Sequence, residues 1–397
     1  MKSVKWMALG LVLAALVAGC KGFWDAPPST TTSNPTTPTT LSSGVFYVLD
    51  QTTKQVVGYS ITSGTLGAIS GGTQTLSAAP FSIAVAPNGG FLYVGTVNGI
   101  YLYTIGSGGA LSIGNNGATI ASDIPAAMVI SGSWLVDAFD ISTGSVQMNA
   151  IPIDASTGAY AGSNGAPPSQ TFTVANAVVK QMVLSPDSAN FLVALGAGGT
   201  IVVPFASGAA NPLGATATTI PVANTGGSAL SVAVDPGTTP RLFYIGETLA
   251  VGASGGLRAF NYSSLGSNPL TEATGSPIAS GGLAPNAISP IATGDYVYVA
   301  NGTGATSAGN IAWFPITATG TAYTIATGKT VTTGIQPSGL AEDSTGNFVL
   351  AVSTGGTTNS GDPDLEAYTM SSGALTAALT SATGTDPTGA LAIAALP

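Results

Sequence analysis

The sequence contains no histidine, a single cysteine and few charged residues. Lys and Arg number 8 and Asp and Glu number 17 among 397 residues, a charged share of 6 %, against a usual share of about 25 %. Without histidine there is no imidazole metal ligand and no Ser-His-Asp or Cys-His relay. With one cysteine there is no internal disulfide and no thiolate zinc site. The net charge of −9 excludes nucleic acid and polyphosphate as partners, because binding them needs clustered cations.

The first 19 residues have the pattern of an export signal. Lys2 and Lys5 precede a charge-free apolar run over residues 6–17, which is shorter than the roughly 20 residues of a membrane span. Val17-Ala18-Gly19-Cys20 follows and resembles the lipobox of bacterial lipoproteins. That resemblance implies a lipid anchor on Cys20, whereas an ordinary signal peptide with a chance cysteine is the alternative. We therefore expect an exported, lipid-anchored protein of the cell envelope. Lys21 replaces the Asp that retains some lipoproteins at an inner membrane, which favours the outer membrane or the cell surface.

A polar segment separates this signal from the rest of the chain. Residues Ser29 to Ser43 read STTTSNPTTPTTLSS, and such a composition cannot bury enough apolar surface to offset its ordering entropy. Residues 20–44 are therefore predicted to be the lipidated cysteine and a flexible, partly extended spacer. The remaining residues, 45–397, form the predicted folded domain.

Three kinds of strand-like segment recur seven times each in this domain. The first kind is spaced 45 to 57 residues apart, within the range of propeller blades, and its copies begin at Pro80, Pro125, Val179, Ser228, Pro285, Pro337 and Pro387. The second kind is rich in aromatic and β-branched residues, and its copies begin at Phe46, Phe91, Trp134, Phe191, Leu242, Tyr296 and Phe348. The third begins at Val56, Ile100, Met148, Ile201, Leu257, Ile311 and Leu365. With a weaker fourth strand, the pattern predicts an all-β fold, a seven-bladed β-propeller of four-stranded antiparallel blades.

The two ends of the domain complement each other. It begins at Val45 with a segment of the second kind and ends, over residues 387–397, with a segment of the first kind. The C-terminal strand is therefore predicted to complete the first blade and to remove the open sheet edges.

The repeated motifs also carry a family resemblance. The Pro-x-x-Ile/Leu-Ala-Val segment at Pro80, the Pro-Asn-Gly turn at Pro87 and the Phe-Leu-Tyr-Val strand at Phe91 resemble lactonase-type seven-bladed propellers. That grouping includes 6-phosphogluconolactonase-like, muconate-cyclising-like and YVTN-repeat surface proteins, and the resemblance covers about residues 45–397. It implies a lactone hydrolase or cyclase acting at the propeller axis. No catalytic residue carries over, because the muconate-cyclising branch uses His, Glu and Arg and this chain has no His.

Few residues are candidates for catalysis. Glu247 and Arg258 fall in blade five, where the alternative to a catalytic role is a structural ion pair. Glu342 follows an innermost strand and is either a channel carboxylate with a raised pKa or a rim charge. Ser254 lies in a Gly-x-Ser-x-Gly sequence, but the nucleophile role of that motif needs a histidine partner. We therefore interpret it as part of a hairpin turn.

Loop lengths predict a binding surface. The loops between the second and third strands are expected to be long in blades five, six and seven, over residues 247–255, 301–309 and 353–362. They would form a polar groove or a partner surface on one face. Candidate binding residues there are Asn301, Asn359, Asp362 and Asp364. The acidic cluster formed by Asp362, Asp364 and Glu366 matches no known calcium-loop spacing. No metal and no cofactor are therefore predicted.

Two functional hypotheses remain open. The first is a non-catalytic, lipid-anchored propeller that binds an envelope protein or a small-molecule ligand, expected to be monomeric. The alternative is a lactone hydrolase or cyclase that uses Glu, Asp, Tyr or Arg in the axial channel. A weaker third hypothesis is a structural surface-layer component.

Overall fold

A computed structural model describes residues 44–397 apart from 63, 163–164, 238–240, 266–269, 320–321, 356–362, 379 and 382–385. The predicted signal, Cys20 and the spacer therefore lie outside the described residues. Within the described ranges, no helix combines the length and the apolar character needed to cross a membrane.

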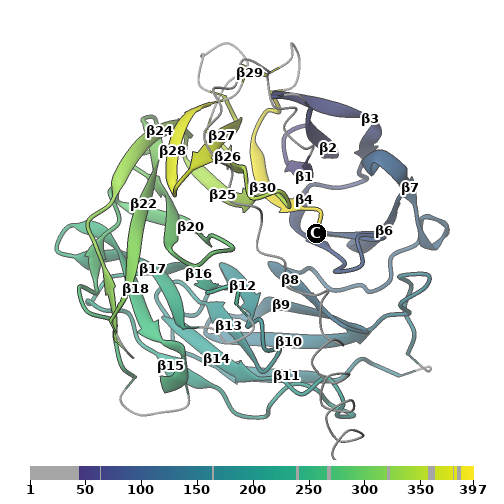
Figure 1. Cartoon of the computed structure of the whole chain (residues 1–397). Coiled ribbons are helices and arrows are strands. Elements are labelled where there is room, and N and C mark those ends of the chain that lie inside the picture. Colours follow the sequence, from purple (N-terminus) through teal and green to yellow (C-terminus); the bar gives the residue numbers. More distant parts are fainter. Residues whose placement is uncertain are drawn as a thin grey trace, which may run out of the picture. The chain divides into compact units, whose positions relative to one another are not determined.

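The described chain forms seven β-sheets arranged as blades around a common axis (Figure 1). Blade one contains β1 (Val45–Asp50), β2 (Gln55–Thr62), β3 (Thr65–Thr75), β29 (Thr380–Ser381) and β30 (Ala390–Ala395). Blade two contains β4 (Pro80–Val85), β5 (Phe91–Thr96), β6 (Gly99–Ile105) and β7 (Leu111–Ile113). Blade three contains β8 (Ala127–Ser131), β9 (Trp134–Ser142), β10 (Ser145–Pro152) and β11 (Ser169–Thr173). Blade four contains β12 (Gln181–Leu184), β13 (Asn190–Ala194), β14 (Thr200–Pro204) and β15 (Thr218–Ile220).

The remaining three blades follow the same plan. Blade five contains β16 (Ala229–Val234), β17 (Leu242–Val251), β18 (Ser254–Asn261) and β19 (Ile278–Ala279). Blade six contains β20 (Ala284–Pro290), β21 (Tyr296–Gly302), β22 (Ala308–Thr319), β23 (Ala322–Ile325) and β24 (Lys329–Ile335). Blade seven contains β25 (Pro337–Glu342), β26 (Phe348–Ser353), β27 (Leu365–Ser371) and β28 (Ala374–Ala378). Short 3₁₀ turns occur at Ser107–Gly109, Asn115–Gly117 and Tyr262–Ser264. The predicted all-β, seven-bladed fold is confirmed, and the innermost strands contact one another all the way round the axis.

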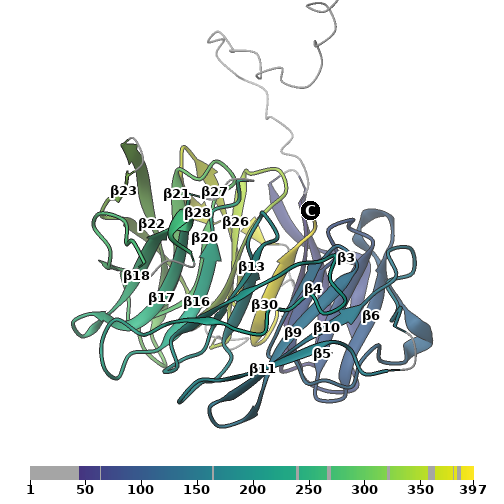
Figure 2. The ribbon, with the colours of Figure 1, turned by 90° about the horizontal axis from the view of Figure 1, so that it is seen from below.

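The second strand of each blade is buried on both faces. Phe46, Tyr47, Val48 and Leu49 of β1 are all 0 % exposed, because the faces of each sheet pack against the two neighbouring blades (Figure 2). Strands covered on both sides favour continuous apolar runs over alternation. This packing explains the high apolar content and the scarcity of charge in the repeats.

Buried tyrosines tie neighbouring blades together. The hydroxyl of Tyr47 in blade one donates to the carbonyl of Gly109 in blade two at 2.9 Å, and Tyr93 and Tyr298 make the corresponding bonds to Gly158 and Gly373 at 2.8 Å. The three acceptor glycines have φ of 84°, 70° and 76°, a left-handed conformation that favours glycine. Burial raises the pKa of Tyr47 to about 12. The pairing of aromatic strands with glycine hairpins is thus a repeated inter-blade contact.

The C-terminal strand closes the ring. β30 pairs antiparallel with β1, with Phe46 opposite Ala395 and Leu49 opposite Ala392, and the amide of Leu396 donates to the carbonyl of Val45 at 2.8 Å. On its other side, the Ser338 hydroxyl of blade seven donates to the carbonyl of Ala390 at 2.9 Å. The predicted completion of blade one is confirmed, with β30 innermost and β29 parallel to β3 at the outer edge.

Removal of β30 should therefore prevent formation of the closed propeller. A chain ending at Gly389 leaves the inner edge of β1 unpaired, and an open sheet edge promotes association with other chains. We expect loss of the cooperative thermal transition in near-ultraviolet circular dichroism, together with oligomers in light scattering. A chain ending at Leu396, which keeps β30, is the control and should behave as the full chain. A monomeric Gly389 truncation that unfolds at the full chain's temperature would contradict the role assigned to β30.

Candidate functional site

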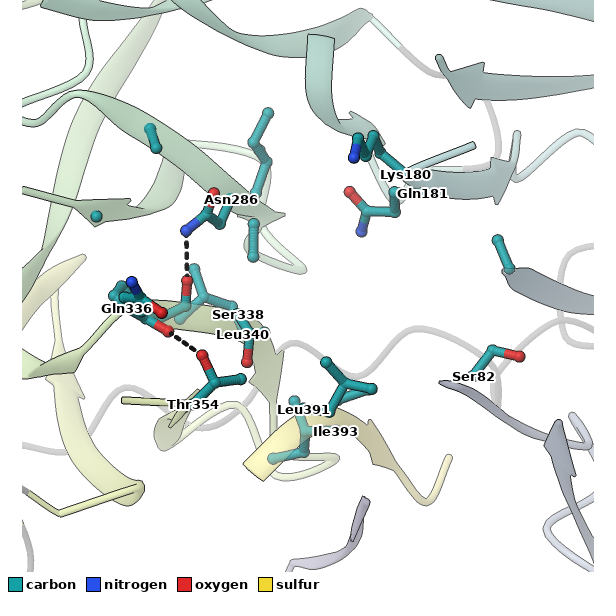
Figure 3. Close-up of a pocket in the computed structure, with 18 of the residues that line it drawn as sticks. Ser82, Lys180, Gln181, Asn286, Gln336, Ser338, Leu340, Thr354, Leu391 and Ile393 are labelled. Carbon is teal, nitrogen blue, oxygen red and sulfur yellow. Dashed lines mark hydrogen bonds between the residues drawn. The ribbon is translucent and has the colours of Figure 1, made fainter. Parts of the chain in front are cut away.

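An axial cavity of about 680 Å³ lies among the innermost strands of six blades. It is lined by parts of β4, β8, β12, β20, β25 and β30, and Figure 3 shows the side chains facing it from several directions. Its apolar walls are formed by Ile83, Met128, Met182, Leu340 and Ile393. A concave pocket with apolar walls and a few polar groups is the general form of a small-molecule site.

The polar groups at this cavity are mainly amides and hydroxyls. They are Ser82, Gln181, Asn286, Gln336, Ser338 and Thr354. Several of them link blades: the Ser82 hydroxyl donates to the carbonyl of Pro125 at 2.8 Å, and the Asn286 amide donates to the carbonyl of Pro337 at 2.8 Å. Gln181 Oε1 accepts a bond from the amide of Val232 at 3.0 Å. These bonds fix the orientation of the side chains that face the axis.

Lys180 is the one charged side chain among the described residues that line the cavity. It immediately precedes β12 and is exposed. No carboxylate and no tyrosine occurs among those described lining residues. The cavity therefore offers one positive charge and several hydrogen-bonding groups to a ligand.

The structure brings Glu247 and Arg258 together, as the sequence suggested, but away from the axial cavity. Arg258 Nη1 lies 3.0 Å from Glu247 Oε1, and Arg258 Nη2 lies 2.7 Å from Oε1 of Glu272. Glu247 is 0 % exposed, and its Oε2 accepts the amide of Ala223 at 2.8 Å. Burial raises the pKa of Glu247, and Arg258 partly offsets that effect. The arrangement is a Glu-Arg-Glu network in which Glu247 is buried and Glu272 is partly exposed, and the guanidinium also lies 4.8 Å from the ring centre of Phe260.

The other candidates from the sequence have structural contacts or lie outside the described residues. Glu342, at the end of β25, accepts the amide of Ala292 at 2.9 Å, and burial raises its pKa. Asn301 is buried and donates to the carbonyl of Ser280 at 2.7 Å and to that of Val299 at 3.1 Å. Asp364 is buried, and its Oδ2 accepts the amide of Gly389 at 2.6 Å. Asn359 and Asp362 lie outside the described residues.

Two of the three expected long loops, those of blades five and six, are shorter than the sequence indicated. In blade five, β17 continues to Val251 and β18 begins at Ser254, so only two residues form the turn. A register shift between Glu247 and Val251 allows the ladder to continue past the expected strand end. In blade six, residues 303–307 connect β21 to β22. Most of the blade-seven loop, residues 356–362, is outside the described residues.

One buried carboxyl, that of Asp137, lies on the face of blade three that packs against blade two. Asp137 of β9 is 0 % exposed, and its Oδ1 accepts the amide of Asn149 at 3.2 Å. Its Oδ2 has no hydrogen-bond donor within the described chain. Asp137 points toward blade two, because Leu135 on the same face of β9 packs with Tyr93 and Leu102. Burial raises the pKa of Asp137 well above its usual range, and the charge of Asp123 adds to that effect.

Two of these groups were missed from the sequence although each left a signal. Lys180 is the only cation in the seven copies of the innermost segment. Asp137 interrupts the apolar run Leu135-Val136-Asp137-Ala138, in a strand expected to be buried on both faces. A charged residue in such a place is expensive unless it is paired or neutralised. Among the described residues, no group of three or more acidic or cysteine side chains is placed to hold a metal ion.

Comparisons with known proteins support the fold. No family model and no curated protein sequence matches the chain. Among solved structures, a putative 6-phosphogluconolactonase from Bacteroides fragilis is similar with a TM-score of 0.65 at 16 % identity, covering 92 % of this chain and 100 % of that one. A periplasmic gluconolactonase from Pseudomonas aeruginosa has a TM-score of 0.65 at 17 % identity, covering 90 % and 99 %. A functionally unknown protein from Desulfotomaculum acetoxidans has a TM-score of 0.64 at 11 % identity, covering 89 % and 99 %. The chain thus has the lactonase-like propeller fold.

Loss of Arg258 should destabilise the protein strongly. Arg258→Met leaves the buried Glu247 without its counter-charge, and breaking a buried pair in this way costs about 3–5 kcal/mol. Arg241→Met is the matched control: Arg241 lies 3.1 Å from Asp235, but Asp235 keeps donors from Tyr244 and the amide of Leu242. We expect a loss of about 1 kcal/mol there. Urea unfolding measures both, and equal losses would contradict the network's role.

The Asp137 carboxyl should make stability depend on pH. Its pKa is higher in the folded than in the unfolded chain, so the folded state binds more protons and loses stability as the pH rises above the ordinary carboxyl pKa of about 4. Asp137→Asn removes this decline. The free energy of unfolding of Asp137→Asn minus that of the wild type should therefore grow with pH.

Asp154 provides a control whose contribution to stability has the opposite pH dependence. Hydrogen bonds from Ser156 and Thr157 lower the pKa of this exposed carboxyl to about 2, so its contribution is present at neutral pH and is lost as pH falls. In urea titrations across the pH range, Asp154→Asn should therefore differ from the wild type only toward neutral pH. A pH-independent difference for Asp137→Asn would show that its carboxyl does not carry the proton.

Proposed function

We propose that the protein is a lipid-anchored binding module of the cell envelope, and that its axial cavity takes a small polyhydroxy ligand with one negative charge. The observation that carries the proposal is the cavity lining. Its polar groups are amides and hydroxyls, and Lys180 is the only charged side chain among the described residues that line it. Amide and hydroxyl groups match ligand hydroxyls, and one ammonium matches one carboxylate. A volume of about 680 Å³ is within the usual range of small-molecule pockets.

Binding fits this lining better than acid–base catalysis does. A general acid or base must lie within hydrogen-bond reach of the reacting atom. The described lining residues include no carboxylate and no tyrosine, and the chain has no histidine. Glu247, Arg258 and Glu342 are engaged in contacts outside the cavity. These observations favour a ligand-binding role over lactone hydrolysis, even though two similar structures have lactonase names.

The anchoring part of the proposal is supported by the sequence. Cys20 is the only cysteine and stands directly after Val17-Ala18-Gly19, at the position that a lipoprotein signal requires. The Ser, Thr and Pro-rich segment that follows would hold the propeller away from the membrane. An exposed ligand pocket on a tethered domain is suited to binding molecules in the envelope.

Calorimetric titration with D-gluconate and D-sorbitol tests the ligand class. Gluconate has a carboxylate that can meet Lys180, whereas sorbitol has hydroxyls only. Lys180→Met should weaken gluconate binding about 10- to 100-fold, since a charged hydrogen bond contributes about 1.5–3 kcal/mol, and should leave sorbitol binding unchanged. Lys329→Met, which alters an exposed lysine outside the cavity lining, is the control. Equal gluconate affinity in Lys180→Met and wild type would contradict the proposal.

The same preparation tests the lactone alternative. D-glucono-1,5-lactone is added and acid release is followed in a pH-stat. Hydrolysis above the spontaneous rate that is lost in Glu247→Gln or Glu342→Gln would favour the lactone hydrolase. Hydrolysis at the spontaneous rate supports the binding role.

A further inference from the structure

A second cavity lies between blades two and three, beside the axial cavity. It has a volume of about 710 Å³, and we call it the blade 2–3 groove. Its apolar walls are formed by Phe81, Ile124, Phe139, Ile141 and Leu391. The groove shares Phe81, Ala126 and Leu391 with the axial cavity but has its own polar groups.

The groove exposes large apolar side chains, whereas most such side chains elsewhere in the described chain are buried. Ile124 is 50 % exposed and Ile141 is 49 % exposed, and they are two of only six large hydrophobic residues exposed in the described ranges. Both lie at the same groove, together with half-buried Phe81 and Phe139. Grouped apolar exposure with a polar border is typical of a binding surface.

Negative charge borders these apolar walls. Asp123 and Asp140 both line the groove, and no Lys or Arg does so among its described lining residues. Asp140 is already held, since it accepts the amide of Val179 at 3.1 Å. Asp123 is half-buried, and its charge contributes to the raised pKa of the buried Asp137. The groove thus combines an apolar wall with two acidic side chains, Asp123 and Asp140, and with no cation among its described lining residues.

Two acidic side chains at one groove without a neighbouring cation favour a positively charged occupant. A calcium ion requires six to eight oxygen ligands, and the described residues supply no group of three acidic side chains. An ammonium or guanidinium group on an aliphatic stem fits better. Its stem packs on apolar side chains while its head donates hydrogen bonds to carboxylates.

We propose that the blade 2–3 groove binds a basic side chain, flanked by apolar residues, from a partner polypeptide. The apolar neighbours pack on Ile124, Phe139 and Ile141, and the basic head bonds to Asp123. The partner's positive charge complements this acidic surface and the chain's net charge of −9. This site is separate from the Lys180 cavity, and it attracts charge of the opposite sign.

Calorimetric titration with a defined peptide tests the proposal. N-acetyl-Leu-Arg-Leu-amide is compared with the same peptide carrying citrulline, which keeps the shape of arginine but has no charge. We expect the arginine peptide to bind at least tenfold more tightly, and added salt to reduce the difference. Asp123→Asn should remove most of this preference, and Ile141→Ser should weaken both peptides. Asp295→Asn, an exposed acid in blade six, is the matched control and should leave binding unchanged.

Several results would overturn the proposal. Equal affinity for both peptides would show that the groove binds through apolar contacts alone, without recognising the charge. Binding of neither peptide at millimolar concentration would exclude the site. An unaltered preference in Asp123→Asn would also exclude it, provided that circular dichroism shows the variant folded. Lys180→Met should bind the arginine peptide as the wild type does, so failure of the peptide test and failure of the gluconate test are distinguishable.

Discussion

The pairing of β30 with β1 is the contact on which the rest of the molecule depends. Each blade covers the faces of its two neighbours, so the packing is complete only when the ring is closed. The bond from the amide of Leu396 to the carbonyl of Val45 and the bond from Ser338 to Ala390 hold this strand on both sides. Both cavities depend on it as well, because Leu391 of β30 lines the axial cavity and the blade 2–3 groove.

The dry interior that closure creates explains how the few charges are used. A buried carboxylate is tolerated where donors surround it, and Asp343 shows the pattern: the amides of Phe348 and Asn347 bond to its Oδ1 at 2.8 and 2.9 Å. Glu247 meets the same requirement through Arg258 and the amide of Ala223. Asp137 meets it for one oxygen only.

The sequence allows prediction of the fold but not of which side chains meet. Three repeated strand types predict seven blades, and the complementary ends predict closure, because both follow from local apolar pattern. The orientation of side chains on the inner strands is harder to predict. The strands β4, β16, β20 and β25 each have a register shift near their start. A one-residue shift reverses which side chains face the axis. The sequence therefore left Glu342 as either a channel carboxylate or a rim charge; in the structure it accepts the amide of Ala292 and does not line the axial cavity. Asp123 and Asp140 line the same groove from different segments of the chain, and no local pattern encodes that proximity.

The two cavities have opposite chemistry and a common wall. Lys180 gives the axial cavity its positive charge, while Asp123 gives the groove a negative one. Phe81 and Leu391 face both, so an occupant that changes their rotamers in one cavity changes the shape of the other. Such coupling is reciprocal by thermodynamic necessity.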